Sequence, residues 1–457
     1  MNTTLVHRFA KGLHLFFIAT LLAGLAIMAT SLEAVSPARA GPGDGPWVIT
    51  TIAGGDPPAV PGAIYAVDTA SNTLYGPFLQ GQLGTVGGGR FDVAITPDCS
   101  TALVSNFGDS MVFFVDVSVP TNPHLLGSVT LPFFAEDIAI TPNGMFAVVS
   151  NGGFSPRLAS IHIPTRKLVE TEDLGNNYAN AVAIAPNGTV IVADYFSAAL
   201  HTLTIDGAGN LTPVASYPFP VITIEGTDFQ DMPVNVAVAC DGQTVLVMAV
   251  SVNWVSVFRI TGPGTLAYTG RVFGLPPVWD DVNKMFHGSQ QSVAFGNDGR
   301  QAYVLTNGRT TLGDDPVELP NQISVLDILS PGQVSLHASG AATLSYYSGS
   351  QLFGVDVVAV AGAQLYVGNP TLSGGVTYLS VVDLTDYSVT DLPVGELEEE
   401  IPVGVAACPD PCPALVPIGG IAVPVNKSEL LAPWAGLAAL ASLTTLTIAL
   451  VRRRRSA

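Results

Sequence analysis

Four long segments of this 457-residue chain combine carboxylates with aromatic side chains. That combination suits a carbohydrate, an amine or a cation, because aromatic faces pack against ring or cationic groups while carboxylates accept hydrogen bonds. The segments begin at Tyr217, Gly274, Asn307 and Thr343. The residues predicted to bind a ligand are Asp228, Asp231, Trp279, Asp280, Asp281, His287, Tyr346 and Tyr347. The alternative is that the aromatic side chains, with Phe229 and Phe286, pack these segments onto the fold while the acids stay solvated.

A second set of carboxylates recurs just before or at the start of short apolar stretches. Its members are Asp92, Glu136, Asp137 and Asp356. A ring of such oxygen ligands could hold Ca²⁺ or Mg²⁺, and the ion could polarise a carbonyl for hydrolysis. Asp92, Asp137 and His287 are then the candidates for catalytic residues. The alternative is that the same side chains satisfy backbone hydrogen-bond donors between repeats.

Other catalytic motifs are absent from the sequence. It contains no G-x-S-x-G turn, no phosphate-binding G-x-x-x-x-G-K-[ST], no H-E-x-x-H and no D-x-[DN]-x-[DN]-G calcium loop. His287 is the one histidine placed in a long segment where it could act as a base or a ligand. The sequence therefore indicates a fold more clearly than a reaction.

The elements that position these residues come from a repeat. Seven copies of an apolar strand followed by a turn, such as FDVAITPD and EDIAITPNG, centre on Ala94, Ala139, Ala183, Ala237, Ala294, Ala359 and Ala406. Their spacings are 45, 44, 54, 57, 65 and 47 residues, the period of a four-stranded propeller blade. We therefore predict an all-β fold, a seven-bladed β-propeller of four-stranded antiparallel blades.

The two ends of the repeat array are predicted to complete one blade together. Residues 47–82 have later strands without an inner strand, and residues 402–410 form an inner strand without a sequel. Pairing them closes the ring and removes two unprotected sheet edges. In such a ring the short turns after the inner strands lie on one face, here called the far face, and the four long segments meet on the opposite near face.

Several phrases resemble known propeller families. IYAVDTASNTLYG, FFVDVSVPTNPHLLGSVTLP and YLSVVDLTDYSV are similar to YVTN and LVIVD repeats, and LTIDGAGNLTPVASYP and FRITGPGTLAYTGRV look like third and fourth strands of lactonase-type seven-bladed propellers. The resemblance covers most of residues 47–410. It implies the fold, and it makes lactone hydrolysis one activity to test, but the catalytic residues of that family are not matched one by one onto this chain, so the resemblance extends to the fold alone.

Both termini predict export to the cell surface. Arg8 and Lys11 precede an apolar run, and Ala38-Arg39-Ala40 fits a signal-peptidase site. Residues 430–451 are uncharged and as a helix would span about 33 Å, with four arginines behind them that favour the cytoplasm. The predicted organisation is a signal peptide at 1–40, the propeller at 41–410, a stalk at 411–429, a transmembrane helix or sorting-signal span at 430–451 and a cytoplasmic tail at 452–457. The tail also resembles the C-terminal sorting signals of prokaryotic surface proteins.

The predicted exported part, residues 41–426, is strongly acidic. It holds nine basic and 34 acidic residues, a formal charge of −25. Such a surface repels phosphate backbones, so nucleic acid is not expected as a partner. Cations and basic partners are favoured, although acidity that serves only solubility is the alternative.

Four cysteines in an exported chain predict at least one disulfide. Cys99 lies in the first complete blade and Cys408 and Cys412 near the closing strand, so a bond from Cys99 to either would fasten the ring. Cys240 stands three repeats away and is predicted to be a free thiol. Candidate glycosylation sites are Asn187, Asn210 and Asn426, each in an N-x-[ST] pattern.

The leading functional hypothesis is a surface-anchored propeller without enzymatic activity, which binds envelope proteins, glycans or small molecules through its near face. The alternative is a lactonase-like hydrolase with a metal-assisted site at the channel mouth. A third hypothesis, a redox propeller resembling quinoprotein dehydrogenases, depends on fold alone.

Overall fold

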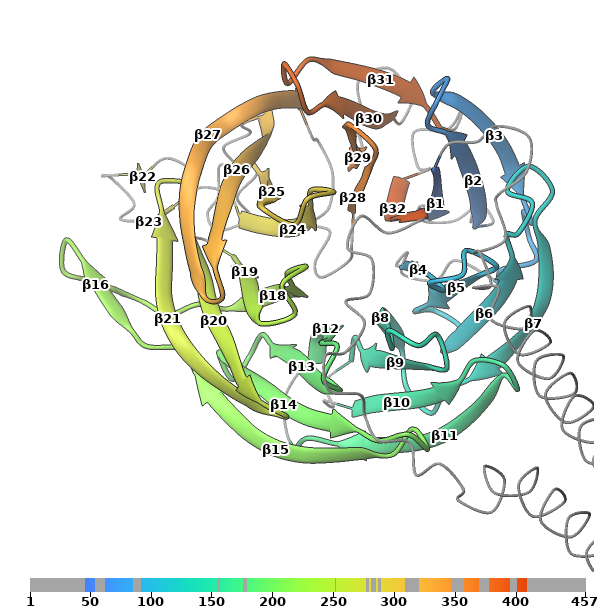
Figure 1. Cartoon of the computed structure of the whole chain (residues 1–457), viewed down its shortest axis with the longest axis horizontal. Helices are drawn as coiled ribbons and strands as arrows, with labels where there is room; N and C mark the ends of the chain where they lie inside the picture. Colours follow the sequence, from blue (N-terminus) through green and yellow to red (C-terminus); the bar gives the residue numbers. More distant parts are fainter. Residues whose placement is uncertain are drawn as a thin grey trace, which may run out of the picture.

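The computed structural model is a closed seven-bladed β-propeller (Figure 1). It describes residues 46–53, 62–84, 92–153, 157–175, 179–250, 252–276, 279–280, 285–286, 289–308, 320–346, 357–369, 378–394 and 401–408. The predicted signal peptide, stalk, membrane span and tail lie outside these residues. No helix occurs among the described residues, and hence none there that could cross a membrane.

Each blade is one four-stranded antiparallel sheet. Blade 1 contains β4 (Val93–Ile95), β5 (Thr101–Asn106), β6 (Met111–Asp116) and β7 (His124–Thr130). Blade 2 contains β8 (Ala135–Ile140), β9 (Phe146–Asn151), β10 (Arg157–His162) and β11 (Lys167–Asp173). Blade 3 contains β12 (Ala179–Ile184), β13 (Thr189–Asp194), β14 (Ala199–Ile205) and β15 (Leu211–Pro218).

The remaining blades repeat this order of strands. Blade 4 contains β18 (Pro233–Val238), β19 (Thr244–Ala249), β20 (Trp254–Gly262) and β21 (Thr265–Phe273). Blade 5 contains β24 (Ser289–Phe295), β25 (Gln301–Asn307), β26 (Pro320–Ser330) and β27 (Gln333–Tyr346). Blade 6 contains β28 (Val358–Ala361), β29 (Gln364–Asn369), β30 (Tyr378–Asp383) and β31 (Val389–Pro393).

Blade 7 is built from both ends of the array, as the sequence predicts. Its sheet has the order β3 (Thr73–Phe78), β2 (Ala63–Asp68), β1 (Trp47–Ala53) and β32 (Ile401–Cys408). In the β1–β32 pair Trp47 lies opposite Cys408 and Ala53 opposite Ile401. A disulfide then joins Cys408 to Cys99 in the β4–β5 turn, with 5.7 Å between the two Cα atoms. The C-terminal strand of blade 7 is thereby covalently linked to blade 1, across a sequence separation of 309 residues.

Cys240 corrects one prediction. It lies in the β18–β19 turn and is disulfide-bonded, so it is not a free thiol. Counting repeats along the chain placed it far from the other cysteines. In a closed ring, however, the number of repeats between two residues does not determine the distance between them.

The hydrophobic core lies between neighbouring blades. The second strands β9, β13 and β19 are buried at every residue, because a strand in the middle of a blade is covered by the blades on both sides. The outer strands are more open, and β11 has only exposed and half-buried residues. Burial therefore falls from the middle of each blade to its outer edge, and the ring is held by apolar contacts between the inner strands of neighbouring blades.

Blades 3 and 4, which frame the candidate site, are also fastened through a hairpin. The tip of the β20–β21 hairpin reaches blade 3, where the Gly264 N–H donates to Thr189 Oγ1 (2.9 Å) and Thr202 Oγ1 donates to the Gly264 carbonyl (2.6 Å). Gly264 has φ +69°, and a Cβ there would come within 2.5 Å of Val214. Only glycine can adopt this positive φ without strain and also leave room for the side chain of Val214.

Two small hairpins stand outside the blades, in segments that the sequence suggested were loops. They are β16 (Ile222–Ile224) with β17 (Thr227–Phe229), and β22 (Trp279–Asp280) with β23 (Met285–Phe286). The first lies in the connection from blade 3 to blade 4, and the second in the connection from blade 4 to blade 5. Among the described residues, both added hairpins therefore stand beside blade 4.

Candidate functional site

The channel-mouth carboxylates of blades 1 and 2 are bound to the backbone of the next blade. Asp92 Oδ2 accepts the N–H of Ile138 (3.0 Å), and Asp137 Oδ2 accepts the N–H of Val182 (2.7 Å). Blade 3 continues the pattern with an amide, since Asn180 Nδ2 donates to the carbonyl of Val234 (2.9 Å). One side chain in each of these three blades therefore ties its inner strand to the following one.

Strand irregularities explain how these side chains reach sideways. The pairing register shifts at the start of β8, β12, β18 and β24, which is the mark of a β-bulge. A bulge turns a side chain out of the regular alternation. The bulges in β8 and β12 lie at Glu136-Asp137 and at Asn180, where Asp137 and Asn180 reach the inner strand of the next blade.

Burial limits what these carboxylates can do. Asp92 and Glu136 are fully buried and Asp137 is 2% exposed. Among the described residues no group of three or more histidine, cysteine, aspartate or glutamate side chains is arranged to hold a metal ion. The fourth member of the predicted Ca²⁺ or Mg²⁺ set, Asp356, lies outside these residues. Asp92 and Asp137 bond between blades.

Asp231, predicted to bind a ligand, is instead the centre of a buried polar network. Its Oδ1 accepts hydrogen bonds from Trp254 Nε1 (2.9 Å) and from Arg271 Nη2 (2.9 Å), and its Oδ2 accepts one from Ser256. Asp231 is fully buried, and the Arg271 side chain is 4% exposed. A buried ion pair is stable only when further hydrogen bonds satisfy both groups, and this one has them.

Trp254 organises the aromatic side chains above blade 4. Its ring packs edge-to-face on Phe229 (6.4 Å between centroids) and on Phe286 (5.9 Å), while the Arg271 guanidinium lies 5.1 Å from its centroid. Ile222 and Ile224 of β16 pack against the same cluster. The structural role considered for the loop aromatics therefore holds for Phe229 and Phe286, which pin the two small hairpins to the blade.

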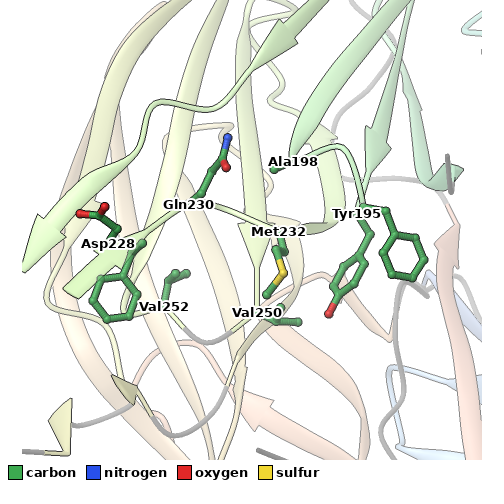
Figure 2. A pocket seen from close by; sticks show the side chains of 9 residues that line it. Tyr195, Ala198, Asp228, Gln230, Met232, Val250 and Val252 are labelled. Carbon is green, nitrogen blue, oxygen red and sulfur yellow. The ribbon is translucent and has the colours of Figure 1, made fainter. Parts of the chain in front are cut away.

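A pocket of about 370 Å³ opens beside this cluster, at the near-face corner between blades 3 and 4. It is lined by Tyr195, Phe196, Ala198, Asp228, Phe229, Gln230, Met232, Val250 and Val252. Figure 2 shows Tyr195 on one side and Asp228 on the other, with Met232 and Val250 between them. The volume is within the range of small-molecule sites, and the lining is mainly apolar with a few polar groups.

Tyr195 and Phe196 lie in the turn between β13 and β14, and hydrogen bonds of the buried Asp194 hold this turn in place. Asp194, fully buried, accepts the N–H of Ser197 (3.1 Å) and faces His201 Nε2 (3.0 Å). Burial alone would raise the pKa of Asp194, but the hydrogen bonds from His201 and Ser197 outweigh it and hold the pKa below its usual range. The ionised carboxylate thus fixes this turn.

The opposite wall is joined to the same turn. Gln230 Nε2 donates to the carbonyl of Phe219 (2.9 Å), and the Phe219 N–H donates to the carbonyl of Ala198 (2.9 Å). At the rim, Asp228 Oδ1 accepts a hydrogen bond from Thr223 Oγ1 (2.6 Å) across the β16–β17 hairpin. Burial raises the pKa of the Tyr195 hydroxyl, which therefore stays protonated at neutral pH.

The structure divides the predicted ligand-binding residues. Asp228 lines the pocket and Asp231 is buried beneath it. Trp279 and Asp280 form β22, and Tyr346 ends β27 opposite Pro320, but their side chains are not described. Asp281, His287 and Tyr347 lie outside the described residues.

Most of the pocket lining was missed from the sequence. Tyr195 and Phe196 lie in the phrase ADYFSA, where a turn between two strands carries adjacent aromatic residues. Comparable turns hold aromatics elsewhere, as Phe107 does in SNFGDS, where it stacks on Phe134 of the next connection (4.9 Å, 15°). Exposed aromatics at second-to-third strand turns were thus the signal that could have located the near-face surface.

Two candidate glycosylation sites fall in described turns. Asn187 is exposed in the β12–β13 turn, where its Oδ1 accepts the N–H of Thr189 (3.1 Å). Asn210 is exposed, and its Nδ2 donates to Asp206 Oδ2 (2.9 Å). Asn426 lies outside the described residues. Modification of these sites stays a prediction.

Comparisons with known proteins identify the fold and leave the chemistry open. No family model matches the sequence, and neither does any curated protein sequence. A functionally unknown protein from Desulfotomaculum acetoxidans is similar in structure with a TM-score of 0.57 at 18% identity, covering 79% of this chain and 98% of its own. The periplasmic gluconolactonase of Pseudomonas aeruginosa is similar with a TM-score of 0.54 at 15% sequence identity. The match covers 79% of this chain and 99% of the gluconolactonase. A putative 6-phosphogluconolactonase from Bacteroides uniformis is similar with a TM-score of 0.54 at 11% sequence identity, and the same shares of both chains are covered.

Proposed function

We propose that this chain is an exported ligand-binding propeller that takes a small molecule at the near-face corner between blades 3 and 4. The observation that carries the proposal is the pocket of about 370 Å³ with aromatic walls, an apolar base and one carboxylate at its rim. The carboxylates that could have supplied metal-assisted chemistry in blades 1 and 2 are buried and bonded to backbone N–H groups. Binding thus has a built site among the described residues.

A screen for pocket-dependent binders tests this function. Full-length protein, purified in mild detergent, is mixed with a library of small fragments, and binding is followed by saturation-transfer NMR. Binders are expected whose signals disappear in the Phe196→Ala variant. The matched control is Phe134→Ala, since Phe134 is also exposed on the near face, 46% against 59% for Phe196, but lies between blades 1 and 2. If no binder distinguishes the two variants, the pocket is not a binding site.

Export and anchoring are the second part of the proposal. The apolar run after Arg8 and Lys11, the uncharged span 430–451 and the four terminal arginines support it. The Cys99–Cys408 disulfide adds support, because structural disulfides persist mainly in oxidising compartments. A chain truncated after Asn426 should be released into the medium or periplasm while the full chain sediments with membranes. Retention of the truncated chain in membranes contradicts the anchor.

Lactone hydrolysis is the alternative function, supported by the likeness of the fold to gluconolactonases at 11 to 15% identity. Fold likeness at this level carries no site. Hydrolysis of a panel of aldonolactones by the full chain, with added Ca²⁺ or Mg²⁺ and after chelation, tests it. Turnover that the chelator abolishes favours the hydrolase; a folded protein without turnover on any lactone of the panel removes its support.

A further inference from the structure

The lining of the pocket holds an acid and no base. Of its nine residues, Asp228 is the one with a charged side chain, and none is lysine, arginine or histidine. Its Oδ1 is positioned by Thr223, and its Oδ2 has no hydrogen-bond partner among the described residues. A carboxylate oriented at the rim of an apolar pocket is a ready partner for an N–H donor, above all a charged one.

Arg271, the cation of the buried network beside the pocket, already has partners of its own. Arg271 binds Asp231 (2.9 Å), donates to the carbonyl of Pro220 (2.7 Å) and stacks on Trp254. With its side chain 4% exposed, it is not available to a ligand in the pocket. An anionic ligand, such as an aldonate or a sugar phosphate, would therefore enter a pocket with a carboxylate at its rim and no counter-charge in its lining.

The walls favour the same sign of charge. Tyr195 and Phe196 both line the pocket and pack edge-to-face on each other (5.0 Å, 88°). A cation near an aromatic face is attracted by the negative charge of the ring. The base, formed by Ala198, Met232, Val250 and Val252, has no side-chain hydrogen-bonding group except the weak methionine sulfur. A sugar would leave most of its hydroxyl groups unpaired there.

We propose that the pocket binds a small amine with an apolar or aromatic body. The ammonium group lies at the rim against Asp228, and the body packs between Tyr195 and Phe229 on the apolar base. The net charge of −19 for the whole chain raises the local concentration of such a cation at low salt. This inference rests on the proposed function, because it specifies the ligand class of the same pocket.

Three probes of equal size and different charge test the inference. They are 2-phenylethylamine, 2-phenylethanol and phenylacetate, titrated into the full chain at pH 7 by ligand-observed NMR. The amine is expected to bind about 5- to 10-fold more tightly than the alcohol, and phenylacetate most weakly. Asp228→Asn should remove the preference for the amine and leave the affinity for the alcohol unchanged.

The control variant separates a contact from a general field. Asp206→Asn removes the same charge from an exposed turn of the β14–β15 hairpin outside the pocket lining. It should keep the preference for the amine within about twofold. Equal losses in Asp228→Asn and Asp206→Asn would show that the net charge attracts the amine, which overturns the assigned contact.

The remaining outcomes distinguish this inference from the proposed function. If the alcohol or the acid binds as tightly as the amine and Phe196→Ala abolishes that binding, the amine class is wrong and the binding function stands. If none of the three probes binds while the fragment screen yields binders that need Phe196, the same conclusion holds. If the probes and the screen both fail, the amine class and the binding function are overturned together.

Discussion

The channel mouth and the corner between blades 3 and 4 use the same residue type in opposite ways. At the mouth, Asp92 and Asp137 are buried and accept backbone N–H groups of the next blade. At the corner, Asp231 is buried in an ion pair while Asp228, three residues earlier, is exposed at the rim of a pocket. Two of these carboxylates tie neighbouring blades together, Asp231 holds a network within blade 4, and Asp228 faces solvent beside an apolar cavity.

The difference shows that the hydrogen-bond partners of a carboxylate determine whether it stabilises the fold or can bind a ligand. Its residue type and its distance from the channel do not determine this. A buried carboxylate needs hydrogen bonds to offset its lost hydration, and once it has them its oxygens are occupied. An exposed carboxylate with one hydrogen bond still has acceptor capacity. Asp231 and Asp228 are the sharpest pair, because they differ in burial within one short segment.

The largest effect should come from Asp231→Ala. The substitution leaves Arg271 buried without its counter-charge, and Trp254 Nε1 and Ser256 lose their acceptor. Breaking a buried ion pair from one side costs about 3–5 kcal/mol of unfolding free energy. Chemical denaturation of the full chain measures it. Asp228→Ala is the control and should change stability by less than about 0.5 kcal/mol; equal losses would erase the contrast between the two acids.

Asp137→Ala should have the next largest effect. It leaves the buried N–H of Val182 without its acceptor and removes the hydrogen bond that the Ile138 N–H donates to Asp137 Oδ1. We expect a loss of about 2–3 kcal/mol, since each unsatisfied buried donor costs about 1–3 kcal/mol. Asp137→Asn keeps one acceptor oxygen and should lose less. A variant as stable as the parent would show that the carboxylate does not clasp the blades.

The sequence carried enough information to predict the ring and its closure. Successive apolar residues in strands such as those around Ala183 and Leu246 are required by burial between two blades, and that requirement is visible as a repeat. The pairing of β1 with β32 followed from two incomplete blades, because an unpaired edge has to be satisfied. Local periodicity therefore determined the architecture.

The site was less predictable because it depends on contacts that no repeat encodes. The acids Asp228 and Asp231 look equivalent in the phrase TDFQDM, and only the distant Arg271 and Trp254 distinguish them. The prediction for Cys240 was wrong for a related reason, since the number of repeats between two cysteines does not determine whether they meet in the folded ring. The Tyr195 turn was not predicted as part of the site, because its aromatic residues lie in a short connection and the prediction used only the long segments.

The contribution of Asp194 to the stability of the folded chain should depend on pH. Its pKa is lowered in the folded chain, because hydrogen bonds from His201 and Ser197 outweigh the effect of burial. The unfolded chain takes up the proton near pH 3.8, and the folded chain does so at lower pH. The stabilisation is therefore complete above about pH 4 and is lost as the pH falls through the folded pKa.

Asp194→Asn should accordingly cost about 1–2 kcal/mol near pH 6 and progressively less in more acid solution. Denaturant titrations of both proteins from pH 6 to pH 3 measure the difference. A cycle with His201→Gln isolates the energy of the pair. A stability difference that is constant over this range would mean that the ionised carboxylate does not support the pocket turn.

The smallest effect is expected from Thr223→Val, which tests whether the exposed carboxylate is truly positioned. Valine keeps the shape and the strand preference of β16 but removes the hydroxyl that donates to Asp228 Oδ1. Stability should change by less than about 0.5 kcal/mol, since both groups are exposed. The affinity for 2-phenylethylamine should fall about two- to threefold, because the carboxylate then samples more orientations before it meets the ammonium group. Unchanged affinity would mean that Asp228 needs no fixed orientation, and a loss as large as that of Asp228→Asn would mean that the threonine itself contacts the ligand.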